Sequence, residues 1–559
     1  MKLLQCRRWC SSVSTGNLAF LLSLTFIPQR TAGFVIINNN DGRIPSRILR
    51  ATDSDESNKP SSFEIGLYVH IPYCRRRCRY CNFAIVPIGT QVDTESPPSR
   101  RSDDELVDVA TQGFLQMDRA YRKSLLQEIE WLRSTTDASD SPIILKSIYF
   151  GGGTPSLAPI ETIHAIWEAL FTTTCTTSSS TTDNTPLFQL TPTAEVSIEM
   201  DPGTFSIEKL YALKDIGFNR ISLGVQSFDD RVLEAIGRVH RRQDVLEAIA
   251  MIHTVFCKDD NGTPPNYSID LISGLPGLDL ALWAETLATA TSLQPSPPNH
   301  ISLYDLQIEQ GTVFGKWYNH HSSDDNNNDD SVSIQHASQR TRATSSILPT
   351  KNDRSMLPSE EDSAFMYKYA AGYLKAKGFE HYEVSSYARH NNNNKMHRSQ
   401  HNQIYWATDG QWFALGLGAT SFVRGQMVAR PRTMVDYQTW AGELQQQQGG
   451  GERQGTVDSK DFLTDVIMKR LRTSDGLDLD WIERHHGKEC LDSVMKGAAL
   501  GLDLGLMTLV EVEDDDKDSG EGSKKNVLRL VDPEGFLYSN NLISSIFVEL
   551  DEIHEDGGD

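Results

Sequence analysis

Three cysteines stand close together in the run IPYCRRRCRYCNF at 71–83. The spacing C-x3-C-x2-C allows three thiolates to reach one small object from a single loop, and cysteine thiolate is the usual ligand of an iron–sulfur cluster. A zinc ion with His70 as fourth ligand is the alternative, although this spacing is unusual for zinc. We therefore predict that Cys74, Cys78 and Cys81 bind a [4Fe–4S] cluster. Three ligands for four irons would leave one iron open to a small molecule.

The overall composition limits the kind of protein that this chain can be. It has 559 residues, enough for roughly two or three domains, and its eight cysteines are too few for a disulfide scaffold. With 53 Lys and Arg against 75 Asp and Glu, the formal net charge is −22. Non-specific nucleic-acid binding needs a basic surface, so we expect no nucleic-acid partner.

The first 60 residues have the pattern of a targeting leader. Residues 1–40 contain no Asp or Glu, and the apolar run LAFLLSLTFI (18–27) is too short to span a bilayer. Such a run followed by a basic, polar stretch resembles the bipartite leaders that carry proteins into plastids; an ordinary mitochondrial presequence is the alternative. We predict that residues 1–60 are removed after import into a plastid. Because no other run reaches transmembrane length, we expect no stable membrane span.

Short β-rich runs alternate with helical stretches through much of the chain. Each run is apolar enough to be a strand buried on both faces of a parallel sheet, and the alternation predicts an α/β fold. Six units indicate a partial (β/α)6 barrel over 61–318, and an open, doubly wound sheet is the alternative. The predicted strands are 66–71, 147–153, 195–202, 220–227, 267–276 and 300–309, and the clearest helices are Ile207–Gly217, Asp230–Ile236, Gln243–Val255 and Leu280–Leu293.

Polar residues and glycines stand at the ends of the predicted strands. They are Gly151–Thr154, Glu199, Gln226 and Asp270. The carboxyl ends of parallel strands meet at the edge where ligands bind in such folds, and bare glycine backbone allows a ligand to approach closely. Both candidate sheets bring these residues to the same edge, so we predict one ligand site there.

Together these motifs resemble the oxygen-independent coproporphyrinogen III oxidase family of radical S-adenosylmethionine (SAM) proteins, over most of 64–318 and 364–425. In that family SAM binds the open iron of the cluster. The resemblance implies that Tyr68 contacts SAM, that GGGTPS (151–156) receives its amino group, and that Glu199 holds its ribose. The SAM-binding residues that it implies are Tyr68, Gly152, Gly153, Thr154, Glu199, Gln226, Arg238 and Asp270.

Two further features separate the branches of this family. The oxidases carry another cysteine two residues after the third cluster ligand, where this chain has Phe83. The run HNQIYW (401–406) matches a motif associated with haem binding in the HemW-type branch, whose members are regarded as haem chaperones. The alternative is a structural His–Asn pair that opens a strand, with core aromatic residues beside it. The haem-binding residues that the resemblance implies are the iron ligand His401 and its neighbours Asn402, Tyr405 and Trp406.

The resemblance therefore implies a haem chaperone in an organelle. It would bind one [4Fe–4S] cluster, SAM and haem, take electrons from a donor, and deliver haem to an acceptor haemoprotein. The enzyme alternative is an oxygen-independent coproporphyrinogen III oxidase, which oxidatively decarboxylates two propionates in porphyrin biosynthesis. A third hypothesis is that the protein is a degenerate relative that binds neither cluster nor haem.

The remaining sequence divides by composition. We expect a disordered polar insert at 319–360, a family-specific region that closes the barrel at 361–445, and a Gln- and Gly-rich linker at 446–460. Polar inserts of this kind bury too little apolar surface to offset the entropy cost of ordering them. Residues 461–559 are predicted to form helices followed by a hairpin. This order of elements indicates an α+β, winged-helix-like domain. The acidic balance of the chain indicates that this domain binds protein or covers the site, and does not bind DNA.

Overall fold

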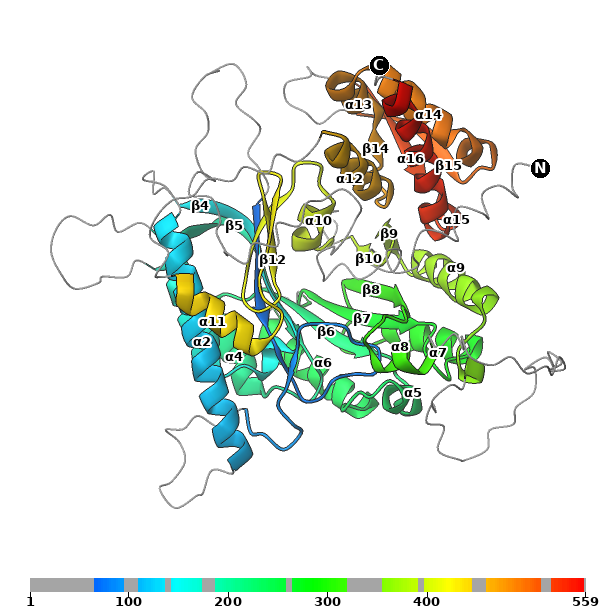
Figure 1. Cartoon of the computed structure of the whole chain (residues 1–559). Coiled ribbons are helices and arrows are strands. Elements are labelled where there is room, and N and C mark those ends of the chain that lie inside the picture. Colours follow the sequence, from blue (N-terminus) through cyan, green and yellow to red (C-terminus); the bar gives the residue numbers. More distant parts are fainter. Residues whose placement is uncertain are drawn as a thin grey trace, which may run out of the picture.

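The computed structural model describes residues 65–94, 109–135, 142–172, 186–257, 264–318, 354–390, 397–444, 459–513 and 524–556 (Figure 1). The predicted leader at 1–60, and nearly all of the predicted insert at 319–360 and linker at 446–460, fall outside these residues. The described residues form a large α/β body and a smaller C-terminal unit, which lies above the body in Figure 1.

Six parallel strands form the centre of the body, as the sequence predicted. Nearly every residue of β1, β6 and β7 is buried, because helices or other layers cover both faces, and this explains the apolar runs in the sequence. Each strand lies beside the next one in this list: β1 (Ile65–Ile71), β4 (Ile143–Gly152), β5 (Phe188–Met200), β6 (Arg220–Gln226), β7 (Tyr267–Ser273) and β8 (His300–Asp305).

Later strands extend this sheet at both edges. At one edge β11 (Gln411–Leu415) pairs in parallel with β1, and β12 (Thr420–Val423) and β13 (Gln426–Ala429) follow it as antiparallel strands. At the other edge β10 (Ser386–Arg389) pairs antiparallel with β8, and β9 (Phe379–Glu383) pairs with β10. The result is one sheet of eleven strands, in which β13 and β9 are the outer strands of the described structure.

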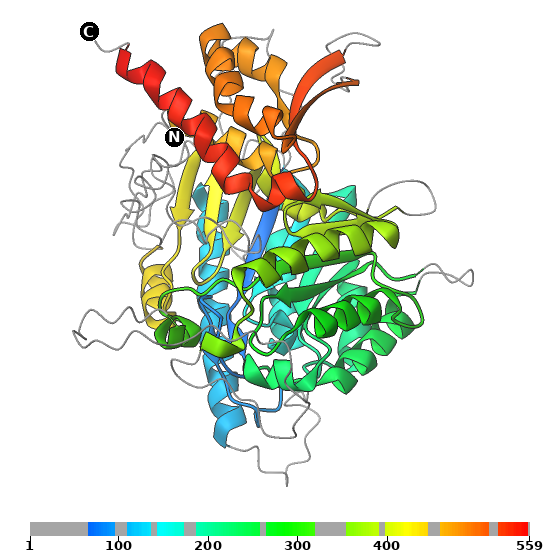
Figure 2. The same cartoon turned by 90° about the vertical axis from the view of Figure 1, so that its right-hand side faces the viewer.

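The helices of the body pack against one another largely in chain order. Helix α2 contacts α3, α3 contacts α4, α4 contacts α6, and α7 contacts α9. A doubly wound sheet would divide its helices between two faces, so the continuous contacts from α2 through α3 and α4 to α6 agree with the partial barrel (Figures 1 and 2). The helices are α2 (Val109–Thr135), α3 (Ile160–Phe171), α4 (Ile207–Ile216), α5 (Asp230–Ala235), α6 (Arg242–Phe256), α7 (Leu280–Thr291), α8 (Val313–Tyr318), α9 (Glu360–Ala376) and α11 (Met434–Glu443).

Side-chain caps fix where several of these helices begin. Ser206, Asp229 and Asp279 accept hydrogen bonds from backbone N–H groups in the first turns of α4, α5 and α7. A cap of this kind stabilises a helix by about 1 kcal/mol. Each cap follows shortly after the end of a strand, so it also holds the loop that leaves the ligand-binding edge of the sheet.

The HNQIYW run forms a helix, α10 (Gln400–Trp406), and the alternative in which it opens a strand is wrong. Ser399 caps this helix by accepting a hydrogen bond from the N–H of Asn402. Since residues four apart lie on one face of a helix, His401 and Tyr405 point the same way. Trp406 ends the helix and packs into the core of the C-terminal unit.

The C-terminal unit has its own apolar core and an α+β architecture. Its three strands lie in the order β14, β16, β15, and β15 and β16 form a hairpin, as the sequence predicted. The predicted order, in which the hairpin follows the helices, is wrong in part, because residues Glu534–Leu537 and Ser539–Asp556 form two further helices after it. In the described part of the chain, no helix is both long and apolar enough to cross a membrane. The elements are α12 (Ser459–Leu471), β14 (Leu477–Asp478), α13 (Leu479–His486), α14 (Lys488–Asp503), β15 (Met507–Glu513), β16 (Lys524–Leu530), α15 (Glu534–Leu537) and α16 (Ser539–Asp556).

Candidate functional site

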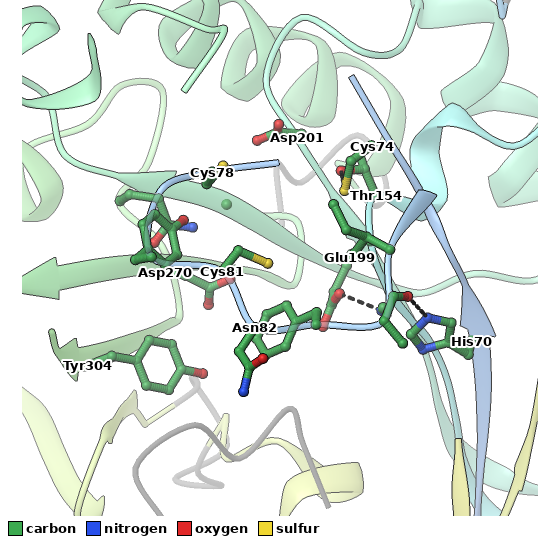
Figure 3. A pocket seen from close by; sticks show the side chains of 18 of the residues that line it. His70, Cys74, Cys78, Cys81, Asn82, Thr154, Glu199, Asp201, Asp270 and Tyr304 are labelled. Carbon is green, nitrogen blue, oxygen red and sulfur yellow. Dashed lines mark hydrogen bonds between the residues drawn. The ribbon is translucent and has the colours of Figure 1, made fainter. Parts of the chain in front are cut away.

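A cavity of about 240 Å³ opens at the carboxyl edge of the parallel strands. All three clustered cysteines line it (Figure 3). The structure therefore brings the cysteine loop and the strand ends together, although they come from six separate parts of the sequence. The other residues that were singled out from the sequence and that line this cavity are Tyr68, Gly152, Gly153, Thr154, Glu199, Gln226, Arg238 and Asp270.

The cysteine loop is held by backbone hydrogen bonds. Cys74 ends the short strand β2 (Tyr73–Cys74), which pairs with β3 (Val86–Pro87), and the loop between them carries Cys78 and Cys81. The N–H of Arg79 donates to the carbonyl of Ile236 over 2.9 Å, which ties the loop to the end of α5. The loop thus keeps its shape through its own backbone and one neighbouring helix.

The arginines between the cysteines contact backbone carbonyls. Arg76 Nε donates to the carbonyl of Gly237 over 2.7 Å, and Arg77 Nη1 donates to that of Phe83 over 2.9 Å. Arg79 Nη1 donates to the carbonyl of Ala235 over 2.5 Å. These guanidinium groups therefore clamp the loop in place while they add positive charge beside the thiols.

The three thiols differ in their partners. Cys74 Sγ lies 3.7 Å from Thr154 Oγ1, and Arg238 Nη1 donates to Cys78 Sγ over 3.7 Å. Burial raises the pKa of the Cys81 thiol to about 12, and burial also raises the pKa of Cys74. Without a bound metal, Cys74 and Cys81 are therefore neutral thiols at physiological pH.

His70 is not free to complete a zinc site. Its Nε2 lies 2.9 Å from the carbonyl oxygen of Ala84, and its Nδ1 lies 3.1 Å from the hydroxyl of Tyr68. Burial lowers the pKa of His70 to about 4, so the ring is neutral. Within the described residues, no three His, Cys, Asp or Glu side chains are grouped closely enough to hold a single metal ion. In a [4Fe–4S] cube each thiolate binds a different iron, so the sulfurs need not meet at one point.

The glycine-rich segment lies against the cysteine loop so closely that side chains are excluded. A Cβ at Gly152, whose φ is +122°, would lie 2.6 Å from the ring of His70. A Cβ at Gly153 would lie 2.6 Å from the backbone oxygen of Tyr73. These contacts explain why glycine occupies both positions, and they leave the backbone of the segment exposed to the cavity.

Glu199 is a partly buried carboxyl group at the cavity wall, fixed by two hydrogen bonds. It accepts from the hydroxyl of Tyr149 over 2.9 Å and from the N–H of Gly152 over 3.0 Å. Burial, together with a smaller effect of the nearby carboxylate of Asp270, raises its pKa to about 8. Burial likewise raises the pKa of Asp270 to about 6. Two desolvated carboxyl groups at neighbouring strand ends are suited to bind the hydroxyl and amino groups of a polar ligand.

Arg238 joins the cluster loop to the strand ends. Its Nη2 donates to Asp201 over 2.5 Å and to the carbonyl of Gly224 over 2.7 Å. Asp201 was not among the predicted residues, although it stands two residues after Glu199 in the predicted strand, and the alternation along a strand puts both on one side. Gln226 has a φ of +66°, an uncommon backbone conformation for a residue other than glycine. Strain of this kind is concentrated at functional sites.

The HNQIYW residues lie behind the cavity wall. Among the described residues that line the cavity, none belongs to α10. His401 is buried, and its Nδ1 lies 2.8 Å from Ser147 Oγ while its Nε2 lies 2.9 Å from the hydroxyl of Tyr405. Burial lowers the pKa of His401 to about 3, so its ring is neutral. The structure thus does not bring His401, Asn402, Tyr405 and Trp406 into the same cavity as the cysteines.

The cavity has further lining residues that the sequence analysis did not single out. Some lie at the end of β8 or just after it, in the predicted run at 300–309. These residues could have been predicted, as Asp270 was, because polar residues at the carboxyl ends of parallel strands line the ligand site. Asn82 directly follows Cys81 in the cysteine motif, whereas Arg432 comes from a distant segment that carries no local pattern. The additional residues include Tyr304, Asp305, Gln307, Glu309, Asn82 and Arg432.

Comparison with known proteins identifies the family to which this chain belongs. A family model described as Radical SAM superfamily matches residues 68–290. The chain is 32% identical over 493 residues to "Heme chaperone HemW" of Synechocystis sp., a match that covers 87% of this chain and 97% of that protein. The chain belongs to the HemW family of radical SAM proteins.

Other relatives agree with this assignment. "Radical S-adenosyl methionine domain-containing protein 1, mitochondrial" of Bos taurus is 29% identical, over 76% of this chain and 77% of that protein. Among solved structures, coproporphyrinogen III oxidase (HemN) from Escherichia coli, titled a radical SAM enzyme, matches with a TM-score of 0.57, over 87% of this chain and 90% of that one. Its sequence identity is 18%, so it bears on the fold alone and confirms the predicted α/β architecture.

The raised pKa of Glu199 predicts a stability gain when its charge is removed. In unfolded chains a glutamic acid ionises near its ordinary pKa of about 4.3, whereas Glu199 in the fold ionises only near pH 8, so ionisation destabilises the fold as the pH rises between these values. In cluster-free protein, Glu199→Gln should therefore raise the Tm at pH 8.5 by a few degrees and leave it unchanged at pH 4.5. Calorimetry or thermal fluorescence at both pH values checks this.

Glu195→Gln is the matched control for that measurement. Glu195 is buried on the same strand, but it is paired with Arg220 over 3.6 Å and accepts hydrogen bonds from the N–H groups of Gln400 and His401. Removing its charge leaves Arg220 without its carboxylate, so this variant should lower the Tm. An equal rise in Tm for Glu199→Gln at both pH values would contradict the role given to ionisation.

Proposed function

We propose that this protein is a radical SAM haem chaperone that binds one [4Fe–4S] cluster, SAM and haem, and delivers haem to an acceptor haemoprotein. The observation that carries the proposal is the single cavity lined by Cys74, Cys78 and Cys81 together with the residues implied to bind SAM. An electron donor is a required partner in this proposal, because the cluster must be reduced.

The donor set of the cavity fits the cluster. Cys74, Cys78 and Cys81 are free thiols on one loop, and two of them have a hydrogen-bond partner at sulfur, Thr154 and Arg238. Hydrogen bonds and cations near the sulfurs favour the reduced, more negative state of an iron–sulfur cluster. When bound, the reduced cluster supplies an electron to SAM.

The remaining lining residues have roles that follow from their chemistry. In this proposal the exposed backbone of Gly152 and Gly153 receives the amino group of SAM. The carboxyl group of Glu199 accepts hydrogen bonds from the ribose hydroxyls. Asp270 and Gln226 offer further polar contacts, and Arg238 is paired with Asp201 so that its charge is already balanced.

The chaperone is favoured over the oxidase by the residue at position 83. Phe83 lines the cavity where the oxidases carry a cysteine, so the site would lack that thiol. Several relatives are named heme chaperones, including those of Synechocystis sp. and Bacillus subtilis. An oxygen-independent coproporphyrinogen III oxidase remains the alternative enzyme function.

Haem binding by the HNQIYW helix requires a movement in this proposal. Both ring nitrogens of His401 are engaged, by Ser147 and Tyr405, and the ring is buried. An iron atom can bind His401 only after one of these contacts is released. Asn402, Tyr405 and Trp406 are buried as well, so haem would meet this motif in a rearranged α10.

The predicted domain arrangement and compartment are also part of the proposal. The leader at 1–60 would direct the protein to a plastid, and the cyanobacterial relative supports this because plastids descend from cyanobacteria. Relatives named mitochondrial, such as that of Bos taurus, support the alternative. The barrel at 61–318, the region at 361–445 and the unit at 461–559 would then act in the imported protein.

Residues 1–60 fused to a fluorescent protein test the compartment. We expect the fusion to accumulate in plastids of an algal host. The apolar run would act as a signal peptide that takes the protein across the first membrane, and the basic stretch would then act as a transit peptide. Deleting 18–27 from the fusion is the control and should leave it in the cytosol. Accumulation of the intact fusion in mitochondria would overturn the plastid assignment.

Cys78→Ala tests the cluster. Anaerobically reconstituted wild-type protein should hold about four irons per chain, and the variant should hold few or none, because a ligand from the middle of the loop is lost. Iron analysis and the visible absorption spectrum measure this. Cys490→Ala, which removes a buried thiol of the C-terminal unit, is the matched control and should keep its iron. Equal iron in Cys78→Ala and wild type would refute the ligand assignment.

One anaerobic preparation distinguishes chaperone from oxidase. We expect the reconstituted protein to bind haem in a spectroscopic titration and to leave coproporphyrinogen III unconsumed in the presence of SAM and a reductant. Consumption of coproporphyrinogen III would establish the oxidase instead. Titrating haem into His401→Ala tests the ligand: a changed spectrum or weaker binding supports His401, and identical behaviour removes it.

A further inference from the structure

His401 lies at the centre of a group of buried rings behind the cavity. Its imidazole stacks on the ring of Tyr149, with ring centroids 5.1 Å apart and planes 18° apart. Tyr149 in turn stacks on Tyr68, at 6.3 Å and 15°. Tyr405 meets His401 edge-on and bonds to it through its hydroxyl. The neutral imidazole is thus fixed in its plane by a hydrogen bond at each nitrogen.

Tyr149 connects this group to the cavity. Its ring is covered by His401 on one side, and its hydroxyl donates to Glu199 over 2.9 Å. Tyr149 itself is outside the residues that line the cavity, whereas Glu199 and Tyr68 line it. The carboxylate at the cavity wall therefore takes its position from a ring whose own position depends on α10.

Glycines leave the space that this arrangement needs. A Cβ at Gly151 would lie 2.8 Å from the ring of Tyr68 and 2.9 Å from that of Tyr149. A Cβ at Gly66 would lie 3.0 Å from Ile404 and 3.3 Å from His401 Nδ1. Gly66 thus allows α10 to approach β1 closely, and Gly151 leaves space for the two tyrosine rings.

We propose that His401 is a positioning residue of the SAM pocket, which holds the Tyr149 ring so that its hydroxyl orients Glu199 toward the ribose. This inference rests on the proposed binding of SAM by Glu199. In this proposal the HNQIYW helix has a role that does not depend on haem binding.

The effect of His401 is steric and not electrostatic. Its ring is neutral at physiological pH, so it supplies no charge to Glu199. The groups that do act on the charge of Glu199 come from other elements, namely Asp270 on β7, Tyr149 on β4 and the N–H of Gly152. A flat ring of similar size should therefore replace His401, whereas a small side chain should not.

SAM affinity of the anaerobically reconstituted protein measures this role. His401→Ala removes the ring that covers Tyr149 and should weaken SAM binding about 3- to 10-fold, the range that one aromatic contact carries. His401→Phe keeps a flat ring over Tyr149 but loses both hydrogen bonds of the imidazole, so it should weaken binding less than His401→Ala does. Tyr149→Phe removes only the hydroxyl and should weaken binding as His401→Ala does. Iron content and Tm are recorded for each variant, so that loss of the cluster or of the fold is seen directly.

His300→Gln is the matched control. His300 is also buried, and its Nε2 lies 2.8 Å from the hydroxyl of Tyr382, but it stands at the opposite end of β8 from the cavity. This variant replaces the ring of an equivalent buried His–Tyr pair, and it should leave SAM affinity unchanged. Equal losses in His300→Gln and His401→Ala would mean that any damage to the core weakens SAM binding, and would overturn the inference.

A double-mutant cycle tests whether His401 affects SAM binding through Glu199. If His401 acts through Glu199, then in a Glu199→Gln background the further change His401→Ala should cost less than about twofold, because the orientation of residue 199 no longer matters as much. A full 3- to 10-fold loss in that background would refute the path. Wild-type protein that does not bind SAM would overturn the proposed function and this inference together, whereas binding by wild type and His401→Ala alike would overturn this inference alone.

Discussion

The parallel pairing of β1 with β4 is the constraint on which the cavity depends. Its register sets Tyr68 beside Tyr149 and Ile71 beside Gly152. Because both strands end at the same edge, the cysteine loop after β1 must lie against the glycine-rich turn after β4. Any side chain at Gly152 or Gly153 would force the two apart. The position of the thiols is therefore set by backbone contact between two loops, before any metal is bound.

Two carboxyl groups at the cavity wall lose part of their hydration in the fold. Glu199 and Asp270 are partly buried, burial raises the pKa of both, and nearby cations do not offset this loss of hydration in full. Arg238 and Asp201 show the contrasting solution, because their charges are paired and burial is offset by that pairing. Carboxyl groups whose lost hydration is not offset by a paired cation are typical of sites that a ligand completes, and this is the general reason why function and stability compete at such positions.

The helix α10 links three parts of the molecule. His401 contacts β4 behind the cavity, Ser399 bonds to the carboxylate of Glu195 on β5, and Trp406 packs into the core of the C-terminal unit. The helix is short, and contacts with neighbouring elements hold it, as is usual for helices of this length. A movement of the C-terminal unit would therefore be felt at α10, and through His401 and Tyr149 at Glu199.

The sequence alone determined the cysteine motif, the six strands and the polar residues at the ends of the strands. These are local properties: the spacing of Cys74, Cys78 and Cys81 is that of one loop, and a buried parallel strand must be a continuous apolar run. Asp201 was within reach of the same reasoning, since alternation along a strand puts it on the side of Glu199. Only the tertiary structure decided the partners of His401, because Ser147 is 254 residues away in the sequence. The tertiary structure likewise brought Arg432 to the carbonyl of Asn82, from which it is 350 residues distant. Spacing and periodicity specify loops and strands, whereas the contacts between distant side chains depend on how those elements pack, and no short pattern records that.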